Sequence, residues 1–154
     1  MKTFQIKNIE QTEQLAKAFS GLLETGDIVA LYGTLGVGKT AFTRFLVQSL
    51  CSNNEEVPSP TFTLLQTYDA PNFPIYHYDL YRLKNPKEVF ELGIEDAFYD
   101  GVSIIEWPEK MGAYLPQKKV LSIQISCTEE IRNIVFSSNN PDWNERLNAW
   151  NVQI

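Results

Sequence analysis

Hydrophobic positions in the first fifty residues alternate between strand-like and helix-like spacing. Residues 3–7 alternate as in a short strand, and residues 28–32 form a continuous apolar run typical of a buried strand. After each segment, apolar side chains recur on one helical face: Leu15, Ala16, Phe19, Leu22 and Leu23 after the first, and Phe42, Phe45, Leu46 and Leu50 after the second. The pattern predicts strand, helix, strand, helix, with Asn8 capping the first helix and Gly26-Asp27 ending it.

Hairpins and short helices are predicted in the rest of the chain. The strand-like segments are residues 62–68, 75–81, 102–106, 120–126 and 131–136. The first two flank a proline-containing turn and the last two flank Thr128-Glu129-Glu130, so each pair predicts a β-hairpin. Further helices are expected from Asn85 to Gly93, from Pro108 and over residues 142–150. The order of elements predicts an α/β fold, a mixed β-sheet with helices on both faces.

Bulk properties are those of an ordinary globular chain. The 154 residues are 44% hydrophobic and 21% charged, and they suggest a single domain over residues 1–154. Residues 52–56 form a polar connector, but no repeat, low-complexity tract or domain linker divides the chain. Cys51 and Cys127 fit no metal-binding spacing, so we expect two buried thiols in a reducing cytoplasm.

Charge and hydropathy limit the partners. The formal net charge is −6, which argues against a free-standing DNA or RNA binder, because neutralising phosphates requires clustered Lys and Arg. RNA could still be reached through a partner that supplies the basic surface. Residues 1–8 lack the apolar core of a signal peptide, and no segment approaches the roughly 18 apolar residues of a membrane helix. A soluble cytoplasmic protein is expected.

The predicted strand at residues 28–32 leads into a glycine-rich loop with a specific pattern. Residues 33–40, Gly-Thr-Leu-Gly-Val-Gly-Lys-Thr, match the Walker A pattern G-x-x-x-x-G-K-[ST] at every fixed position. Its glycines let backbone N–H groups surround phosphate oxygens at the positive end of the following helix. Lys39 can reach the β- and γ-phosphates, and the Thr40 hydroxyl can bind Mg²⁺. The strand–loop–helix context predicts a P-loop NTPase-like fold that binds a nucleotide.

A phosphate loop needs a carboxylate for Mg²⁺, usually at the end of a neighbouring strand. Glu106 ends the apolar run at residues 102–106, and Asp79 ends the strand that begins at residue 75. Either carboxylate alone is weak evidence for a metal site, and the presence of the phosphate loop in the same chain strengthens the evidence for both. Trp107 should lie near the nucleotide if Glu106 does.

Three other polar residues have a structural interpretation beside a functional one. Thr61 lies in a proline-bracketed loop and could meet Mg²⁺ and the γ-phosphate, although a plain turn hydroxyl is the commoner role. His77, the one histidine, is expected to be packed or hydrogen-bonded rather than catalytic. Arg82 and Arg132 could contact phosphate or base, although surface positions are more usual for arginine. The N-K-x-D and G-x-G-x-x-G sequences are missing, which argues against a GTPase and a dinucleotide-binding fold.

Taken together, the ordered motifs resemble those of the bacterial TsaE (YjeE) family of ATPases, which serve the formation of threonylcarbamoyladenosine in tRNA. The resemblance covers nearly the whole chain and rests on residues 33–40, 59–62, 77–83 and 105–110. The sequence Arg132-Asn133-Ile134 also looks similar to the family. Two departures are Val37, where a small alanine is usual, and Ala41, which removes a hydroxyl that could contact the α-phosphate. Neither changes Lys39 or Thr40, so activity is expected to persist.

The resemblance implies a role for each matching residue. Lys39 would bind the phosphates, Thr40 and Glu106 would hold Mg²⁺, and Asp79 would hold a Mg²⁺-bound or attacking water. Thr61 would sense the γ-phosphate. The catalytic group would be Asp79, Glu106 and Lys39. The nucleotide-contacting set would be Thr12, Gly33, Leu35, Gly36, Val37, Gly38, Lys39, Thr40, Ala41, Thr61, Trp107 and Arg132.

The resemblance also implies ATP and Mg²⁺ as cofactors and the TsaD–TsaB pair as partners, with weak ATPase activity that the partners stimulate. tRNA would be reached only through them, and neither DNA nor a membrane is expected as a partner. Two alternatives stay open. One is a small-molecule P-loop kinase, although the sequence has no arginine-rich lid segment. The other is a non-catalytic nucleotide-gated binding module, against which the presence of both Asp79 and Glu106 argues.

Overall fold

A computed structural model describes residues 1–52 and 54–154. The polar connector predicted at residues 52–56 includes residue 53, which lies outside the described residues. Within the described part of the chain, one seven-stranded sheet has the order β1-β7-β6-β2-β5-β4-β3. The strands are β1 (Lys2–Ile6), β2 (Ile28–Tyr32), β3 (Leu65–Asp69), β4 (Pro74–Asp79), β5 (Val102–Glu106), β6 (Leu121–Thr128) and β7 (Ile131–Ser138). The sheet is mixed, as predicted, and both predicted hairpins form.

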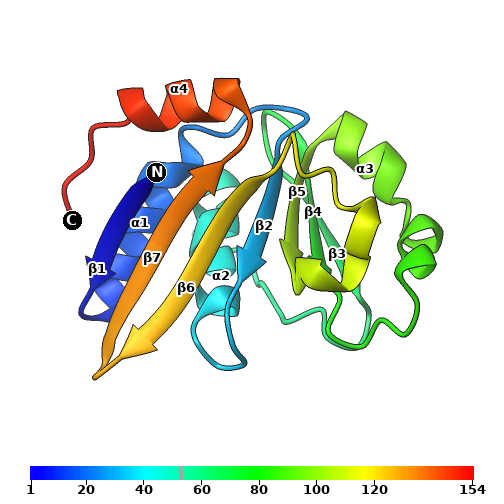
Figure 1. Cartoon of the computed structure of the whole chain (residues 1–154), viewed down its shortest axis with the longest axis horizontal. Coiled ribbons are helices and arrows are strands. Elements are labelled where there is room, and N and C mark those ends of the chain that lie inside the picture. Colours follow the sequence, from blue (N-terminus) through cyan, green and yellow to red (C-terminus); the bar gives the residue numbers. More distant parts are fainter. Residues whose placement is uncertain (53) are drawn as a thin grey trace.

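The centre of the sheet is parallel and its edges are antiparallel. Strand β2 runs parallel to β5 and β6, and β5 runs parallel to β4. Strands β1, β7 and β6 pair in antiparallel fashion at one edge, and β3 pairs with β4 at the other. The carboxyl ends of the four parallel strands therefore lie at the same end of the molecule, the lower end in Figure 1. Ligand sites of α/β proteins form at this edge.

Helices cover both faces of the sheet, which confirms the predicted α/β architecture. Helices α1 (Ile9–Ser20) and α2 (Lys39–Leu50) pack together behind the sheet in Figure 1. Helix α3 (Ile94–Asp100) and the 3₁₀ helices η1 (Pro86–Leu92) and η2 (Pro108–Tyr114) cover the other face. Helix α4 (Pro141–Ala149) lies at the upper end in Figure 1. No helix in the described residues combines the length and apolar character needed to cross a membrane.

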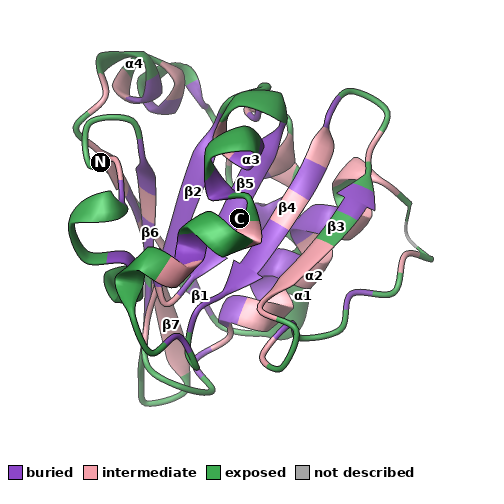
Figure 2. Ribbon diagram, turned by 90° about the vertical axis from the view of Figure 1, so that its right-hand side faces the viewer, coloured by how far each residue is buried: buried purple, intermediate pink, exposed green. Residues whose placement is uncertain are grey.

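Two hydrophobic cores lie on opposite faces of the central strands. In β2, Val29 and Leu31 join the core under α1 and α2, whereas Ile28 and Ala30 join the core under α3, η1 and η2. Side chains along a strand point alternately to the two faces, so a strand covered on both sides must be apolar throughout. This explains the continuous hydrophobic run of β2, which is buried up to its last residue, and the mostly apolar sequence of β5, in which Ser103 and Glu106 are buried with the rest of the strand (Figure 2).

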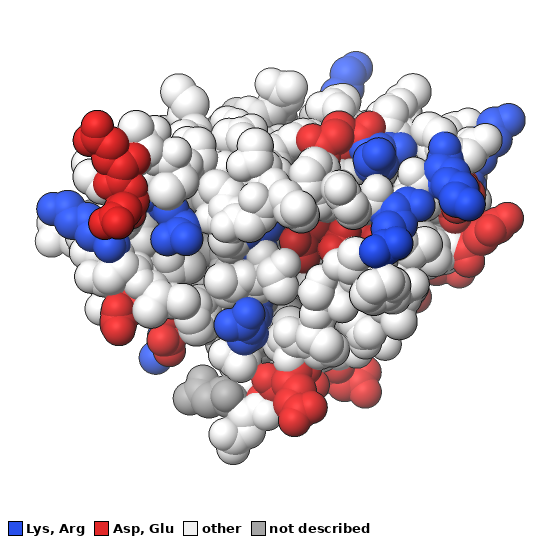
Figure 3. All heavy atoms as spheres, turned by 90° about the horizontal axis from the view of Figure 1, so that it is seen from below, with Lys and Arg blue, Asp and Glu red and all other residues white. Residues whose placement is uncertain are grey.

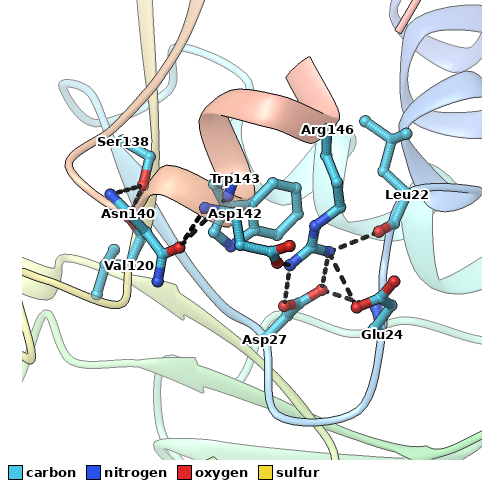
Figure 4. A network of polar contacts seen from close by, with 9 residues as sticks. All are labelled: Leu22, Glu24, Asp27, Val120, Ser138, Asn140, Asp142, Trp143 and Arg146. Carbon is cyan, nitrogen blue, oxygen red and sulfur yellow. Dashed lines mark hydrogen bonds and ion pairs between the residues drawn. The ribbon is translucent and has the colours of Figure 1, made fainter. Parts of the chain in front are cut away.

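An arginine adds polar contacts to the apolar packing that holds helix α4 on the rest of the fold. The Arg146 guanidinium donates to both carboxylate oxygens of Asp27, at 2.8 and 2.9 Å, and to the Leu22 carbonyl at 2.8 Å (Figure 4). It also pairs with Asp142 one turn earlier and stacks on the Trp143 ring. Burial opposes the charge, but the hydrogen bonds and charges of Asp27 and Asp142 raise the pKa of Arg146 above its ordinary range.

One predicted helix boundary is wrong, another predicted helix is confirmed at both caps, and one helix was not predicted. The first helix ends at Ser20 with Gly21 at its C-cap, not at Gly26-Asp27. Gly26 instead adopts φ 96° in the turn before β2, where its N–H donates to the Gly101 carbonyl. The predicted helix from Asn85 to Gly93 is confirmed, with Asn85 as N-cap and Gly93 as C-cap, and it is a 3₁₀ helix. The sequence pattern does not predict helix α3, which follows directly, because Gly93 is expected only to end a helix, whereas it also stands at the N-cap of α3.

Candidate functional site

The glycine-rich loop forms an open turn between β2 and α2 at the carboxyl edge of the sheet. Gly36 and Gly38 have φ values of 78° and 118°, which L side chains rarely adopt. Gly38 is the N-cap of α2 and provides no side-chain cap, so the first N–H groups of the helix are free for a ligand. A Cβ on Gly33 would lie 2.7 Å from the Ile125 carbonyl oxygen, so the loop needs glycine there to pack against β6. Such a turn is suited to an anion.

Lys39 is held beneath this loop. Only 4% of the residue is exposed, and its ammonium Nζ donates to the Gly33 carbonyl at 2.7 Å. The same Nζ lies 3.5 Å from the centroid of the Trp107 ring. Burial lowers the pKa of Lys39, while the nearby charges of Glu106, Glu109 and Asp79 oppose that shift. A buried cation thus lies where the loop would receive phosphate.

Two carboxylates face this lysine because β4 and β5 are in register. Asp79 and Glu106 are paired positions at the ends of the two parallel strands, and both are buried. The Thr40 hydroxyl donates to Glu106 Oε1 at 3.1 Å, and the Thr61 hydroxyl donates to Asp79 Oδ2 at 2.9 Å. The second oxygen of Asp79 accepts from the Tyr81 N–H at 3.0 Å. The parallel register and these hydrogen bonds therefore gather residues from four separate segments at one point.

A cleft of about 240 Å³ connects these groups. Its lining comprises Leu35, Gly36, Gly38, Lys39, Thr40, Ala41, Ser59, Thr61, Asp79, Glu106 and Trp107. Of the predicted nucleotide-contacting residues, Gly33, Val37, Thr12 and Arg132 are outside this lining. Gly33 instead accepts from Lys39, and the Val37 carbonyl accepts from Arg132 Nε at 2.8 Å.

Thr12 and Arg132 line a second, smaller hollow of about 50 Å³. Ile9, Ile125 and Ile134 provide its apolar walls, and Gly38 and Ala41 line both this hollow and the cleft. The two spaces therefore meet at the start of α2. An elongated ligand could place one end among the charged groups and a flatter, less polar end between α1 and the β6–β7 hairpin.

The donor set of the cleft fits a hard divalent cation. Thr40, Asp79 and Glu106 offer oxygen atoms, which Mg²⁺ prefers. Across residues 1–52 and 54–154, no group of three or more His, Cys, Asp or Glu side chains could hold a metal ion. A magnesium ion at this position would therefore need phosphate and water oxygens as well, which is how Mg²⁺ is usually bound beside a nucleotide.

Two residues of the site were not predicted as functional. Ser59 lines the cleft, and its hydroxyl is 2.7 Å from that of Thr61. His77 is fully buried and its Nε2 is 2.5 Å from Glu106 Oε2. The prediction that His77 is packed and hydrogen-bonded is confirmed, but its partner is a site carboxylate. The available signal was strand alternation, which places His77 on the same face of β4 as Asp79.

The face around the cleft carries both signs of charge. Figure 3 looks onto the lower end of the molecule, where blue side chains gather toward one side and red ones lie among and beside them. Large apolar side chains are also exposed at this end, with Leu35 73% and Phe62 82% accessible. The Arg82 guanidinium lies 4.4 Å from the centroid of the Phe62 ring.

Comparison with known proteins gives one consistent result. The family model described as "Threonylcarbamoyl adenosine biosynthesis protein TsaE" matches residues 6–134. A protein of Rickettsia bellii named tRNA threonylcarbamoyladenosine biosynthesis protein TsaE is 50% identical over 107 residues, 70% of this chain and 74% of that protein. A Bacillus subtilis protein of the same name is 33% identical over 132 residues, 85% of this chain and 82% of that protein. The crystal structure of YdiB from Bacillus subtilis superimposes with a TM-score of 0.78 at 28% identity, covering 97% of this chain and 93% of that one.

Proposed function

This chain belongs to the TsaE family of threonylcarbamoyladenosine biosynthesis proteins, and from that membership we propose that it is a Mg²⁺-dependent ATPase that supports the TsaD–TsaB complex in modifying tRNA. Hydrolysis by the isolated chain is weak and rises when the partners bind. The observation that carries the proposal is the convergence of Lys39, Thr40, Asp79 and Glu106 on one cleft. A loop with the complete Walker A pattern forms one wall of that cleft.

The phosphates of ATP would occupy the glycine-rich turn. Backbone N–H groups at the start of α2 and the Lys39 ammonium would donate to phosphate oxygens. For Lys39, these bonds would replace its present contacts with Gly33 and Trp107. Arg132 supports this turn from β7 through its bond to the Val37 carbonyl. The nucleoside would extend into the apolar hollow beside Thr12, where Ala41 offers no hydroxyl to the α-phosphate.

Thr40 and Glu106 would hold Mg²⁺, with Asp79 bound to it directly or through water. The cation supplies charge neutralisation for the phosphate oxygens during transfer. Thr61 now donates to Asp79, so it is placed to exchange that bond for one to the γ-phosphate. Asp79 would then be free to orient a water molecule, which makes it the residue on which hydrolysis depends most.

Exposed apolar side chains around the cleft support a protein partner over its mouth. Leu35 lies in the glycine-rich loop, Phe62 follows Thr61, and the Tyr81 ring packs 5.0 Å from that of Trp107. Large apolar groups gathered at one place are characteristic of interaction surfaces. We assign this surface to the TsaD–TsaB pair, which would also carry the contacts to tRNA that a chain of net charge −6 lacks. The proposed setting is the cytoplasm, with no role for DNA or a membrane.

A reconstituted modification assay tests the proposal. Threonylcarbamoyladenosine in tRNA is quantified by mass spectrometry after multiple turnovers of TsaD–TsaB with and without this chain. In parallel, calorimetry measures binding of ADP and Mg²⁺ to the chain alone. We expect nucleotide binding by the chain and a higher product yield in its presence. An unchanged yield, or no binding at millimolar nucleotide, would contradict the proposal.

A further inference from the structure

The two carboxylate oxygens of Glu106 have different partners. Oε1 accepts from the Thr40 hydroxyl at 3.1 Å, beside the cleft. Oε2 is 2.5 Å from Nε2 of His77, away from Thr40. Because a carboxylate only accepts hydrogen bonds, His77 must donate from Nε2. Oε1 thus faces the cation position, and Oε2 is hydrogen-bonded to a side chain of the sheet.

Among the described residues, Glu106 is the one hydrogen-bond partner of the His77 side chain. His77 is 0% exposed and lies in the middle of β4, beside Ile104 of β5 in the strand register. Its second ring nitrogen, Nδ1, has no hydrogen-bond partner within the described residues. Burying an imidazole with an unsatisfied nitrogen costs free energy that an aliphatic side chain would avoid. The contact with Glu106 is therefore the feature of this position that requires a histidine.

We propose that His77 is a positioning residue that keeps Oε2 of Glu106 out of the metal coordination sphere, so that Glu106 offers a single oxygen and the site favours Mg²⁺ over Ca²⁺. The inference rests on the proposed function, because it assumes that a divalent cation binds with nucleotide in this cleft. It goes beyond the proposed function by assigning a role to His77, which lies behind the cleft, and by giving a structural cause for the preference for Mg²⁺ over Ca²⁺.

Coordination chemistry connects this hydrogen bond to selectivity. Mg²⁺ takes six ligands in a compact octahedron and is usually held by carboxylates through one oxygen each. Ca²⁺ takes six to eight ligands and readily accepts a carboxylate through both oxygens. A Glu106 that is free to rotate could present both oxygens to the larger ion. With Oε2 held by His77, only the geometry suited to Mg²⁺ is available.

The test is calorimetry of ADP binding with Mg²⁺, with Ca²⁺ and with EDTA, applied to the unchanged chain, His77→Phe and His77→Gln. His77→Phe keeps a ring of similar size but cannot donate, whereas the amide of His77→Gln can reach the same oxygen. Loss of an outer-shell partner lowers metal affinity by about 10–100-fold. Mg²⁺ should increase the ADP affinity of the unchanged chain, and we expect that increase to be about tenfold smaller in His77→Phe. The ratio of the ADP affinity with Mg²⁺ to that with Ca²⁺ should also fall in this variant. His77→Gln should retain most of both.

Affinity in EDTA separates positioning from a structural role. It should stay within about twofold of the unchanged chain for both variants, because phosphate contacts to the loop do not involve His77. The inference would be overturned if His77→Phe lost equal ADP affinity with Mg²⁺ and in EDTA. It would also be overturned if the ratio of its ADP affinity with Mg²⁺ to that with Ca²⁺ were unchanged. If His77→Phe does not fold, as judged by thermal unfolding without nucleotide, His77→Asn gives the same comparison, since its shorter amide falls short of Glu106. Failure of the unchanged chain to bind ADP would instead contradict the proposed function itself.

Discussion

Lys39 Nζ lies 3.5 Å from the centroid of the Trp107 ring while it donates to the Gly33 carbonyl. The lysine of the phosphate loop is thus satisfied within the chain, by an aromatic face and a backbone oxygen. A cation over an aromatic ring gains about 0.5–2 kcal/mol, less than a charge-assisted bond to phosphate provides. Trp107 has φ 59°, an uncommon backbone conformation for a bulky residue, and it directly follows Glu106. Departure of Lys39 toward phosphate would therefore change the surroundings of this tryptophan.

Tryptophan fluorescence should report nucleotide binding. Addition of ADP with Mg²⁺ is expected to alter the emission, because Lys39 would leave the Trp107 ring for the phosphates. Trp143 and Trp150 belong to the core beside α4, at the other end of the molecule, and should contribute a constant background. Trp107→Phe is the control and should abolish the change while ADP binding persists in calorimetry. A flat titration of the unchanged chain at saturating ADP would count against Trp107 and Glu106 as parts of the site.

Substitution of the phosphate-loop residues should separate phosphate binding from cation binding. Lys39→Ala removes the buried cation, and a hydrogen bond to a charged group contributes about 1.5–3 kcal/mol. A loss of about 10-fold to 150-fold in ATP affinity is expected, with or without Mg²⁺. Thr40→Ala should weaken binding mainly when Mg²⁺ is present. Calorimetry decides between these outcomes, and unchanged ATP affinity in Lys39→Ala would disprove the assignment of the loop.

Local patterns predicted the fold because each marks a physical requirement that acts within a few residues. The apolar run of β2, the loop that follows it and the turn prolines all have short-range causes, and the structure contains the elements they predict. Helix α3 was missed because one residue serves two elements. Gly93 ends η1 and begins α3, and a glycine signal cannot tell these roles apart.

The arrangement of the candidate site could be predicted only in part. The sequence indicated Glu106 and Asp79 as strand-end carboxylates, but their pairing depends on the parallel register of β4 and β5, which is a long-range property. The bond from His77 to Glu106 follows from the same register and has no local signature. Likewise, the contact of Arg132 with the glycine-rich loop joins residues 95 positions apart. Such contacts arise from topology, which local spacing does not encode.

Arg146 should be important for stability and unimportant for the cleft. Arg146→Ala would leave the carboxylate of Asp27, whose side chain is 9% exposed, without its cation. Breaking a buried ion pair on one side costs about 3 kcal/mol, equivalent to about 6–12 °C in the unfolding temperature at this size. The matched control is Asp142→Asn, whose partner bond is largely exposed and contributes less than about 1 kcal/mol. Thermal unfolding measures both, and ADP affinity should be unaffected. If Arg146→Ala lowered the unfolding temperature no more than the control does, the role of Arg146 in stability would be contradicted.

The two cysteines should differ in their reaction with iodoacetamide. Burial raises the pKa of the Cys51 thiol, and the charges of Glu55 and Asp69 add to that shift. Because the thiolate is the nucleophile, a raised pKa leaves less of the reactive form at neutral pH, and the rate climbs as pH rises. The prediction of two buried thiols is wrong, because Cys51 is only partly buried and Cys127 is exposed. Cys127 should therefore be alkylated first near pH 7.5. Mass spectrometry of the two peptides over a range of pH, with Cys127→Ser as control, tests this. Equal rates at neutral pH would contradict it.

Hydrolysis should depend on the partners and on Asp79. Charge that develops on the γ-phosphoryl group needs more than Lys39 and Mg²⁺, and a cation supplied by a partner raises such rates by about 10³–10⁵-fold where it has been measured. The local candidate, Arg82, is held against the exposed ring of Phe62. We therefore expect slow phosphate release by the chain alone and a clear increase when TsaD–TsaB is added.

Asp79→Ala tests the same mechanism from inside the cleft. The carboxylate of Asp79 now accepts from Thr61 and from the Tyr81 N–H, so it is fixed in place before nucleotide binds. A group that orients water acts mainly in the transition state, and its loss lowers the rate far more than the affinity for substrate. Asp79→Ala should therefore remove the partner-stimulated phosphate release and keep ATP affinity within a few-fold of the unchanged chain. The control is Asp142→Asn, an acidic residue on α4 at the opposite end of the molecule, which should retain stimulation. Rapid hydrolysis by the chain alone, insensitive to TsaD–TsaB, would instead favour a kinase or an independent ATPase, because the missing cation would then have to come from this chain.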